Sequence, residues 1–329
     1  MKEQCDSRIE AGGKGKKVNW VNGNILRSLP FSPFPFTLFG QFMSIRLLAL
    51  DLDGTLLNSR GKLSGRNRLA LNQARERGVR IALVTGRRFR DARPIALELG
   101  LDLPLISHNG ALTKHVQTLE TVAAVLLPLE AAREVLRVGR RAGGDAMVSD
   151  DPDGAGLLVY DHVSGDNRAL AEYIRWARTV HGNDSGDAVR QVDSLEEYLD
   201  HAPVHVAFSG HCEPMRRLAE ILKSELGSVV KIFPTLYPPR DFGLLDIVHP
   251  DASKATGVAA AAAELDITHN EVMAIGDNLN DVEMLSWAGT GVAMANAEPG
   301  LKEIAGVHLT ASNDEDGVAM AIERFVLQS

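Results

Sequence analysis

Short apolar runs that end abruptly in polar residues constrain the fold of this chain more than any other feature of its sequence. Residues 45–50 form such a run and are followed directly by Asp51. Residues 79–84 form a second run and are followed by Thr85. Near-continuous apolar runs of this length are typical of parallel strands that are buried on both faces. The sequence therefore predicts buried strands that deliver polar side chains at their carboxyl ends.

Segments with helical patterns lie between these runs. Ser64 has the character of a helix N-cap, and the segment from there to Arg77 carries an apolar stripe before Gly78 ends it. Strands that alternate with helices predict an α/β fold with a doubly wound, Rossmann-like parallel sheet. Ligands of such sheets bind outside the carboxyl ends of the strands, which is where the polar residues fall.

The pattern of apolar runs that end in polar motifs stops near residue 127. Residues 127–243 have helical and strand patterns of their own but no strand that ends in a polar motif, which predicts an inserted α/β domain. Its acidic segment 150–154 lacks the bidentate Glu of a calcium loop and predicts a solvated turn. The first pattern resumes near Leu244, so the core domain is predicted to consist of residues 43–126 and 244–329.

The first 42 residues differ from the rest of the chain. They have a net charge of +3, against −11 for the remainder, and show neither helical nor strand periodicity. We interpret residues 1–42 as a disordered N-terminal extension and Met43 as the natural start of the protein. A targeting or partner-binding tail is the competing interpretation.

The composition excludes several classes of protein. The net charge of −8 and the pI near 5.7 give no electrostatic reason to expect nucleic acid as a partner. No apolar run approaches the roughly 18 residues that a bilayer span needs, so no membrane partner is expected. The two cysteines, Cys5 and Cys212, lack a partner motif, which predicts a reducing, cytoplasmic location.

Two carboxylates follow the first predicted strand. Asp51 and Asp53 are two residues apart, so both can point into one space, and Gly54 permits a tight exit from the strand. An acidic turn would be the better interpretation of an isolated D-x-D-G motif. The buried strand aimed at the pair favours function, because clustered carboxylates repel unless a cation lies between them.

The same arrangement recurs after a later apolar run. Residues 272–275 are followed by Asp277 and, four residues on, by Asp281. Carboxylates from two strand ends could converge on one hard cation, for which oxygen ligands suit Mg²⁺. The alternative to a cation site is a purely structural role, in which the two residues form an Asx turn and an N-cap of the following helix. This role suits Asp281 better than Asp277.

Two further segments could bind an anion. Thr85 and Gly86 offer a hydroxyl and backbone N–H groups at a predicted helix start. Lys254, just inside the helix that begins at Ser253, could supply a positive charge to phosphate. Each signal is weak alone, because a Thr-Gly pair after a strand is common and most lysines are solvated surface residues.

The order of these motifs carries more information than any one of them. A D-x-D-G-T, a strand-ending T-G, a helix-start Lys and a G-D-x-x-N-D each close a different α/β unit, and together they resemble the four-motif signature of the haloacid dehalogenase superfamily. The inserted block resembles the large C2 cap of its Cof-type branch (class IIB). The segment around Asn109 is similar to the N-G-A segment of that branch.

The resemblance implies roles for nine residues. Asp51 would be the nucleophile and Asp53 the general acid and base. Mg²⁺ would be held by Asp51, the backbone carbonyl of Asp53 and Asp277, with Asp281 in a supporting position. The phosphate or substrate would be bound by Thr85, Gly86, Asn109, Lys254 and Asn280.

The expected function is hydrolysis of a small phosphorylated metabolite, such as a sugar phosphate or a phosphorylated cofactor, through an aspartyl-phosphate. A phosphomutase shares the first half of that reaction and is the nearest alternative. A regulatory member without turnover is a third interpretation, which the complete set of motifs disfavours. The substrate and the oligomeric state stay open at this level.

Overall fold

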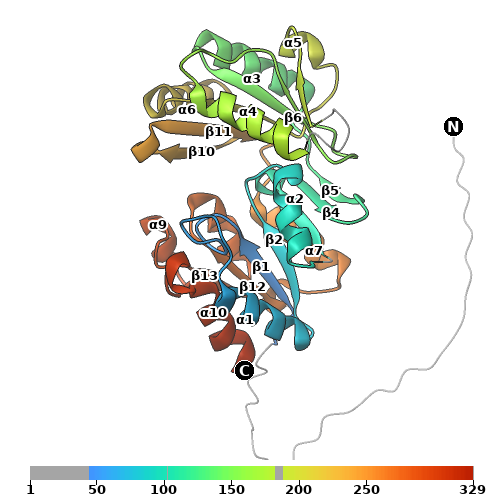
Figure 1. Ribbon diagram of the computed structural model, residues 1–329, viewed down its shortest axis with the longest axis vertical. Coiled ribbons are helices and arrows are strands. Elements are labelled where there is room, and N and C mark those ends of the chain that lie inside the picture. Colours follow the sequence, from blue (N-terminus) through green and yellow to red (C-terminus); the bar gives the residue numbers. More distant parts are fainter. Residues whose placement is uncertain (1–43, 102, 182–187, 329) are drawn as a thin grey trace, which may run out of the picture. The chain divides into compact units, whose positions relative to one another are not determined.

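The computed structural model describes residues 44–101, 103–181 and 188–328, which form two β-sheets with helices packed on them (Figure 1). The predicted extension, residues 1–42, lies outside the described residues. The first sheet has the strand order β14-β13-β12-β1-β2-β3-β4-β5. Its strands are β1 (Leu47–Asp51), β2 (Arg80–Val84), β3 (Pro104–Ser107), β4 (Leu112–His115), β5 (Thr121–Ala124), β12 (Val272–Gly276), β13 (Thr290–Ala293) and β14 (His308–Leu309).

Strands β14 to β3 run parallel to one another, and only β4 and β5 are antiparallel to their neighbours. This confirms the predicted α/β class with a parallel sheet. Strand β1 lies between β12 and β2, and all five of its residues are buried. Because these three strands are parallel and in register, their carboxyl ends meet at one edge of the sheet.

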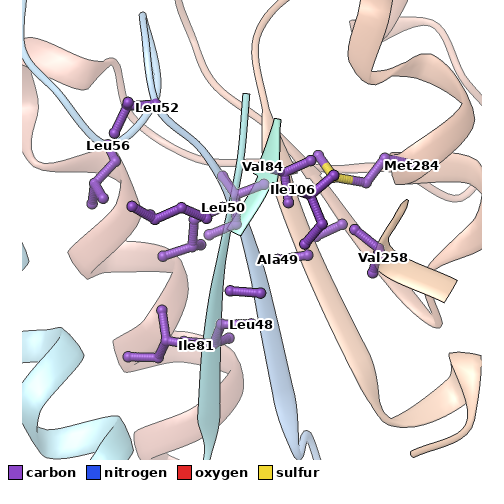
Figure 2. Close-up of a cluster of buried hydrophobic side chains, with 14 of the residues drawn as sticks. Leu48, Ala49, Leu50, Leu52, Leu56, Ile81, Val84, Ile106, Val258 and Met284 are labelled. Carbon is purple, nitrogen blue, oxygen red and sulfur yellow. The ribbon is translucent and has the colours of Figure 1, made fainter. Parts of the chain in front are cut away.

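Side chains of β1 alternate between the two faces of the sheet. Leu48 and Leu50 point to one face, and Ala49 points to the other, toward Val258 and Met284 (Figure 2). This alternation follows from the two-residue period of a strand. Apolar layers on both faces explain why β1 reads as an unbroken apolar run in the sequence.

Two pairs of helices pack on this sheet, α1 with α10 and α7 with α8. As predicted, Ser64 caps α1 and Ser253 caps α7. The side chain of each serine accepts a hydrogen bond from the backbone N–H three residues further along the chain. Among the described residues no helix is both long enough and apolar enough to cross a membrane. The helices are α1 (Gly65–Glu76), α2 (Phe89–Glu98), α7 (Lys254–Glu264), α8 (Val282–Trp287), α9 (Pro299–Lys302) and α10 (Gly317–Ile322), with short turns η1 (His108–Gly110), η3 (His269–Glu271), η4 (Leu279–Asp281), η5 (Asn313–Glu315) and η6 (Glu323–Leu327).

The second sheet is built from the segment between β5 and α7 and has the order β10-β11-β9-β6-β7-β8. Its strands are β6 (Asp145–Asp150), β7 (Leu157–Tyr160), β8 (Val189–Gln191), β9 (His205–Gly210), β10 (Lys231–Tyr237) and β11 (Phe242–Val248). Its helices are α3 (Leu129–Arg141), α4 (Arg168–His181), α5 (Leu195–Tyr198) and α6 (Cys212–Leu226), with the short turn η2 (Pro238–Arg240).

Strand β11 corrects the predicted boundary of the inserted segment. The sequence placed the return to the core at residue 244, whereas Phe242–Val248 pairs along its length with β10 and also with β9. The chain rejoins the first sheet only at α7. The apolar run in β11 resembles a buried core strand, because periodicity reports that a strand is buried but not which sheet buries it.

The two faces of the second sheet pack against different helices. Val148 and Val206 point to one face and pack with apolar residues of α3 and α6. Met147, Leu158 and Ala207 point to the other face and pack with apolar residues of α4. The period of two along each strand thus gives the second sheet two apolar faces, one packed on α3 and α6 and the other on α4.

A buried lysine joins β4 of the first sheet to the turn between β6 and β7. Lys114 Nζ donates to the carbonyl oxygens of Pro152 at 2.5 Å and Gly154 at 2.6 Å. Burial lowers the pKa of Lys114, and the nearby Asp151 and Asp153 oppose that effect. The acidic segment, predicted to be a solvated turn, is instead partly buried around this ammonium group.

Replacing Lys114 by Met is expected to lower the free energy of unfolding by about 1.5–3 kcal/mol, because two partly buried carbonyl groups lose a charged donor. Lys223 lies on the exposed surface of α6, and its replacement by Met should change stability by less than about 0.5 kcal/mol. Urea denaturation of both variants measures the difference. Equal stability of the two would show that the Lys114 contact contributes nothing.

Candidate active site

A buried ionic cluster lies at the carboxyl edge of the first sheet. Lys254 Nζ is 2.6 Å from Asp51 Oδ1 and 2.6 Å from Asp281 Oδ1. Asp51 is the last residue of β1, Lys254 is the first residue of α7, and Asp281 follows β12. All three side chains are at most 5% exposed. The fold therefore brings together three residues that lie far apart in the sequence.

Asp277 completes this cluster from the end of β12. Thr55 Oγ1 donates a hydrogen bond to Asp277 Oδ1 at 2.8 Å. Gly54 has a φ of +80°, and a Cβ on it would lie 2.2 Å from Asp277 Oδ2, so only glycine fits there. Asp281 Oδ2 accepts a hydrogen bond from the backbone N–H of Asp277 at 3.0 Å. Asp281 thus acts both as a local cap and as an ion-pair partner of Lys254.

The charges in the cluster shift the pKa values of its members. Burial raises the pKa of Asp51 well above its usual range, and Asp281 and Asp277 add to the rise while Lys254 opposes it. Burial and the charge of Asp281 raise the pKa of Asp277 to about 6. Burial alone would lower the pKa of Lys254, but Asp281 and Asp51 outweigh it and raise that pKa above its ordinary value.

The donor set fits a divalent cation. One carboxylate oxygen each from Asp51, Asp277 and Asp281 lies within 4.8 Å of the others. Lys254 supplies one positive charge against three carboxyl groups, and burial together with the neighbouring carboxylates raises the pKa values of Asp51 and Asp277. Oxygen ligands in this arrangement suit a hard ion of the size and charge of Mg²⁺.

Asp53 lies beside the cluster but faces a different partner. Arg87 Nε and Nη2 donate to the two carboxylate oxygens of Asp53 at 2.7 and 2.6 Å. The Asp53 side chain is 53% exposed, in contrast to the buried Asp51. A bidentate contact of this kind requires an ionised carboxylate. In this arrangement both carboxylate oxygens of Asp53 accept hydrogen bonds from Arg87.

Thr85 lies where strand β2 ends, at the same edge. Its Oγ1 accepts a hydrogen bond from the backbone N–H of Arg87 at 3.1 Å, which leaves its hydroxyl hydrogen available for a ligand. The backbone N–H of Asn109 donates to the Thr85 carbonyl at 3.1 Å. A Cβ on Gly86 would lie 3.0 Å from Asn109 Oδ1. Thr85, Gly86 and Asn109 therefore form one compact group.

Asn109 connects this group to two other loops. Its Oδ1 accepts a hydrogen bond from Asn280 Nδ2 at 2.8 Å, and its Nδ2 donates to Asp246 Oδ2 at 3.4 Å. Gly110 has a φ of +93°, and a Cβ on it would lie 1.8 Å from the carbonyl oxygen of Ser253. The N-G-A segment therefore packs directly against the start of the helix that carries Lys254.

Three residues of this site had no role predicted from the sequence. Thr55 lies inside the D-x-D-G-T motif and Arg87 directly follows the T-G pair, so their positions after a strand end could have singled them out. Asp246 lies within β11, which the sequence assigned to the core. Asp246 could have been noticed because it is a single carboxylate within an otherwise apolar strand, and a buried carboxylate needs a polar partner.

A cavity of about 720 Å³ opens beside Gly86. Gly86 and Arg87 line it from the first sheet, and Met147, Leu158 and Asp246 line it from the second. Its volume is in the range that binds a small organic molecule. The cavity therefore provides space for a small molecule beside Gly86 and Arg87.

A doubly wound sheet with a buried Asp–Lys–Asp cluster at its carboxyl edge, together with a cavity large enough for a small molecule, is typical of α/β enzymes that bind ligands at the carboxyl ends of their strands. Residues 48–322 match the family of haloacid dehalogenase-like hydrolases. The chain therefore belongs to this family, which confirms the resemblance predicted from the four motifs.

Relatives and solved structures of this family match most of the chain. Phosphatase YwpJ of Bacillus subtilis is 31% identical, covering 84% of this chain and 98% of its own. The 5-amino-6-(5-phospho-D-ribitylamino)uracil phosphatase YcsE of the same organism is 30% identical, covering 87% and 97%. The crystal structure of a haloacid dehalogenase-like hydrolase from Bacteroides thetaiotaomicron is 28% identical, covers 85% and 99%, and superposes with a TM-score of 0.69. The chain is a hydrolase that acts on phosphoric monoesters.

Proposed function

We propose that this phosphatase requires Mg²⁺ and hydrolyses a small phosphorylated metabolite through an aspartyl-phosphate on Asp51. The observation that carries the proposal is the 2.6 Å contact between Lys254 and Asp51 in a buried site to which Asp277 also contributes. A buried aspartate next to a fixed cation can attack a phosphate dianion that would otherwise be repelled.

In the first half-reaction a carboxylate oxygen of Asp51 attacks phosphorus, and the bond between phosphorus and the ester oxygen breaks. Asp53 donates a proton to the departing alcohol. Since Arg87 holds both oxygens of Asp53, that contact has to open before Asp53 can take up a proton. Lys254 and the Thr85 hydroxyl stabilise the negative charge on the transferring phosphoryl oxygens.

In the second half-reaction Asp53 accepts a proton from water, whose oxygen attacks the phosphorus of the aspartyl-phosphate. The bond between phosphorus and Asp51 breaks, which restores the carboxylate and releases inorganic phosphate. When bound between Asp51, the Asp53 carbonyl and Asp277, Mg²⁺ would offset the charge of the phosphate. Asp281 keeps Lys254 in place, and Asn109 and Asn280 position the substrate.

The inserted segment between β5 and α7 would serve as a cap that covers the leaving group and excludes water. The relative YcsE is named for a phosphorylated uracil derivative, which supports a small phosphorylated metabolite as the substrate here.

The test is phosphate release from a panel of phosphate monoesters. We expect steady release in the presence of Mg²⁺, loss of release with excess EDTA, and recovery when Mg²⁺ is restored. Release that continues in EDTA would contradict the proposed metal dependence. A phosphomutase would instead require a bisphosphate primer and release little inorganic phosphate, so primer-independent release separates the two activities.

A further inference from the structure

A buried network of polar side chains joins the inserted segment to a loop of the candidate active site. Residues 85–88 form this loop, which follows β2, carries Thr85 and Gly86, and leads into α2. Its last residue, Arg88, contacts Asp91 in the first turn of α2 and also contacts α4 of the inserted segment. The network therefore connects the part of the site that is proposed to bind phosphate to a different sheet of the molecule.

Arg88 and Asp91 form a buried ion pair at the point where the loop becomes α2. Arg88 Nε donates to Asp91 Oδ2 at 2.8 Å, and its Nη2 donates to Asp91 Oδ1 at 2.9 Å. Both side chains are at most 9% exposed. Because a buried ion pair with two parallel hydrogen bonds is costly to break, it restrains the end of loop 85–88.

Two residues of α4 complete this ion pair from the inserted segment. The hydroxyl of Tyr173 accepts a hydrogen bond from Arg88 Nε at 2.6 Å and donates one to Asp91 Oδ2. His181 Nε2 lies 3.1 Å from Asp91 Oδ1. Each carboxylate oxygen of Asp91 therefore has one partner on Arg88 and another on α4.

The pKa shifts in the network agree with these donor and acceptor roles. Burial alone would raise the pKa of Asp91, but Arg88, His181 and Tyr173 outweigh it and lower that pKa. Burial raises the pKa of Tyr173 above its ordinary value. Asp91 is therefore ionised, and the Tyr173 hydroxyl keeps the proton that it donates.

Aromatic contacts hold the two α4 residues together. The rings of Tyr173 and Trp176 stack with centroids 5.8 Å apart and an angle of 19° between their planes. Trp176 meets the ring of His181 edge-on, at 5.7 Å and 79°. Both geometries are favourable for aromatic pairs. The inserted segment therefore presents Tyr173 and His181 to Asp91 as one packed group.

Loop 85–88 is bound to the rest of the site at its other end. The backbone N–H of Arg87 donates to Thr85 Oγ1 at 3.1 Å, and the Arg87 carbonyl accepts from the backbone N–H of His108 at 3.0 Å. The Arg87 side chain contacts Asp53, as described above. A displacement of Arg88 would therefore move Arg87, and with it groups that contact Thr85 and Asp53.

Resting on the proposed function, we propose that Tyr173 is a positioning residue for phosphoryl transfer. Through Arg88 and Asp91 it holds loop 85–88 in the arrangement that binds the phosphate, without taking part in the chemistry itself. Since small displacements of groups around a transferring atom are costly in rate, hydrolysis depends on this contact whichever leaving group is bound.

A direct contact with the leaving group is the competing role, because Tyr173 also lines the cavity. Orthovanadate separates the two roles. It imitates the five-coordinate phosphoryl group and carries no leaving group, so its affinity reports on the phosphate-binding residues. Weaker binding of orthovanadate in a Tyr173 variant is expected only if Tyr173 acts through the loop.

Tyr173→Phe is the test, because it removes the hydroxyl and keeps the ring. We expect kcat for p-nitrophenyl phosphate to fall about ten-fold and the Ki of orthovanadate to rise by a similar factor. Tyr160→Phe is the matched control. The Tyr160 hydroxyl also has two partners, Gln191 at 3.2 Å and Arg178 at 2.8 Å, but all three residues lie within the inserted segment. This control should change neither quantity.

A double-mutant cycle tests whether Tyr173 acts through Arg88. Arg88→Lys keeps the positive charge beside Asp91 but loses the bidentate contact and the Nε donor to Tyr173. It should lower kcat about ten-fold by itself. In that background Tyr173→Phe should lower kcat by less than about two-fold, whereas fully additive losses would show that Tyr173 acts independently of Arg88.

The outcomes separate this proposal from the proposed function. If Tyr173→Phe lowers kcat but leaves the Ki of orthovanadate unchanged, Tyr173 contacts the leaving group and the positioning role is wrong. If it lowers only the melting temperature, the network merely docks the inserted segment, and the proposal is also wrong. If the folded wild type with Mg²⁺ hydrolyses no ester, the proposed function is contradicted, and calorimetric titration of both proteins with orthovanadate still decides the role of Tyr173.

Discussion

Replacing Asp51 by Asn is expected to reduce phosphate release by more than about 10⁴-fold, the scale seen when a covalent nucleophile is removed. The amide has nearly the shape of the carboxyl group but cannot attack phosphorus. The variant should be at least as stable as the wild type. Burial already disfavours the charge of Asp51, and Asp281 and Asp277 repel it.

Activity and thermal stability are measured together on the Asp51 variant. Asp266→Asn is the matched control, because Asp266 is an exposed residue after α7 whose φ of +50° asparagine also tolerates. It should retain full activity. Substantial activity in Asp51→Asn would refute the nucleophile assignment, and a variant that is both inactive and unfolded would leave Asp51 with a structural role only.

Replacing Lys254 by Met is expected to affect activity and stability at once. Phosphate release should fall by about 10²–10³-fold, because one fixed positive charge no longer stabilises the transferring phosphoryl group. The free energy of unfolding should fall by about 3–5 kcal/mol, because Asp51 and Asp281 would be left buried without their cation.

A double-mutant cycle separates the two effects of Lys254. In the Asp51→Asn background, Lys254→Met should cost less stability, because one of the two buried carboxylates is already neutral. Lys223→Met provides the control for loss of a lysine from a solvent-exposed helix surface. If Lys254→Met unfolds at the same urea concentration as the wild type, the cluster does not have the ionic character assigned to it.

Much of the first sheet could be predicted from local patterns. The apolar runs at residues 45–50 and 79–84 became β1 and β2, and their carboxyl ends were predicted to within one residue, although β1 begins two residues later than its run. Ser64 and Ser253 cap the helices that were expected to begin there. These features depend on interactions within a few residues, namely strand burial and the satisfaction of the first N–H groups of a helix.

The candidate site could be proposed from motif order, but its internal contacts could not. The order of four motifs pointed to Asp51, Asp277 and Lys254 as neighbours, and the structure places them together. It did not indicate that Arg87 holds Asp53, because a bidentate contact depends on the direction of two side chains from different loops. Nor could the sequence indicate that His205 Nε2 lies 3.3 Å from Asp246 Oδ1, for the same reason.

By itself the sequence determined where buried strands and capped helices form and which residue types lie at their ends. Tertiary structure alone decided that β11 joins the second sheet and that residues of both sheets line one cavity. The reason is physical: a side-chain period reports that a surface is buried, whereas the partner that buries it is chosen by contacts between distant segments.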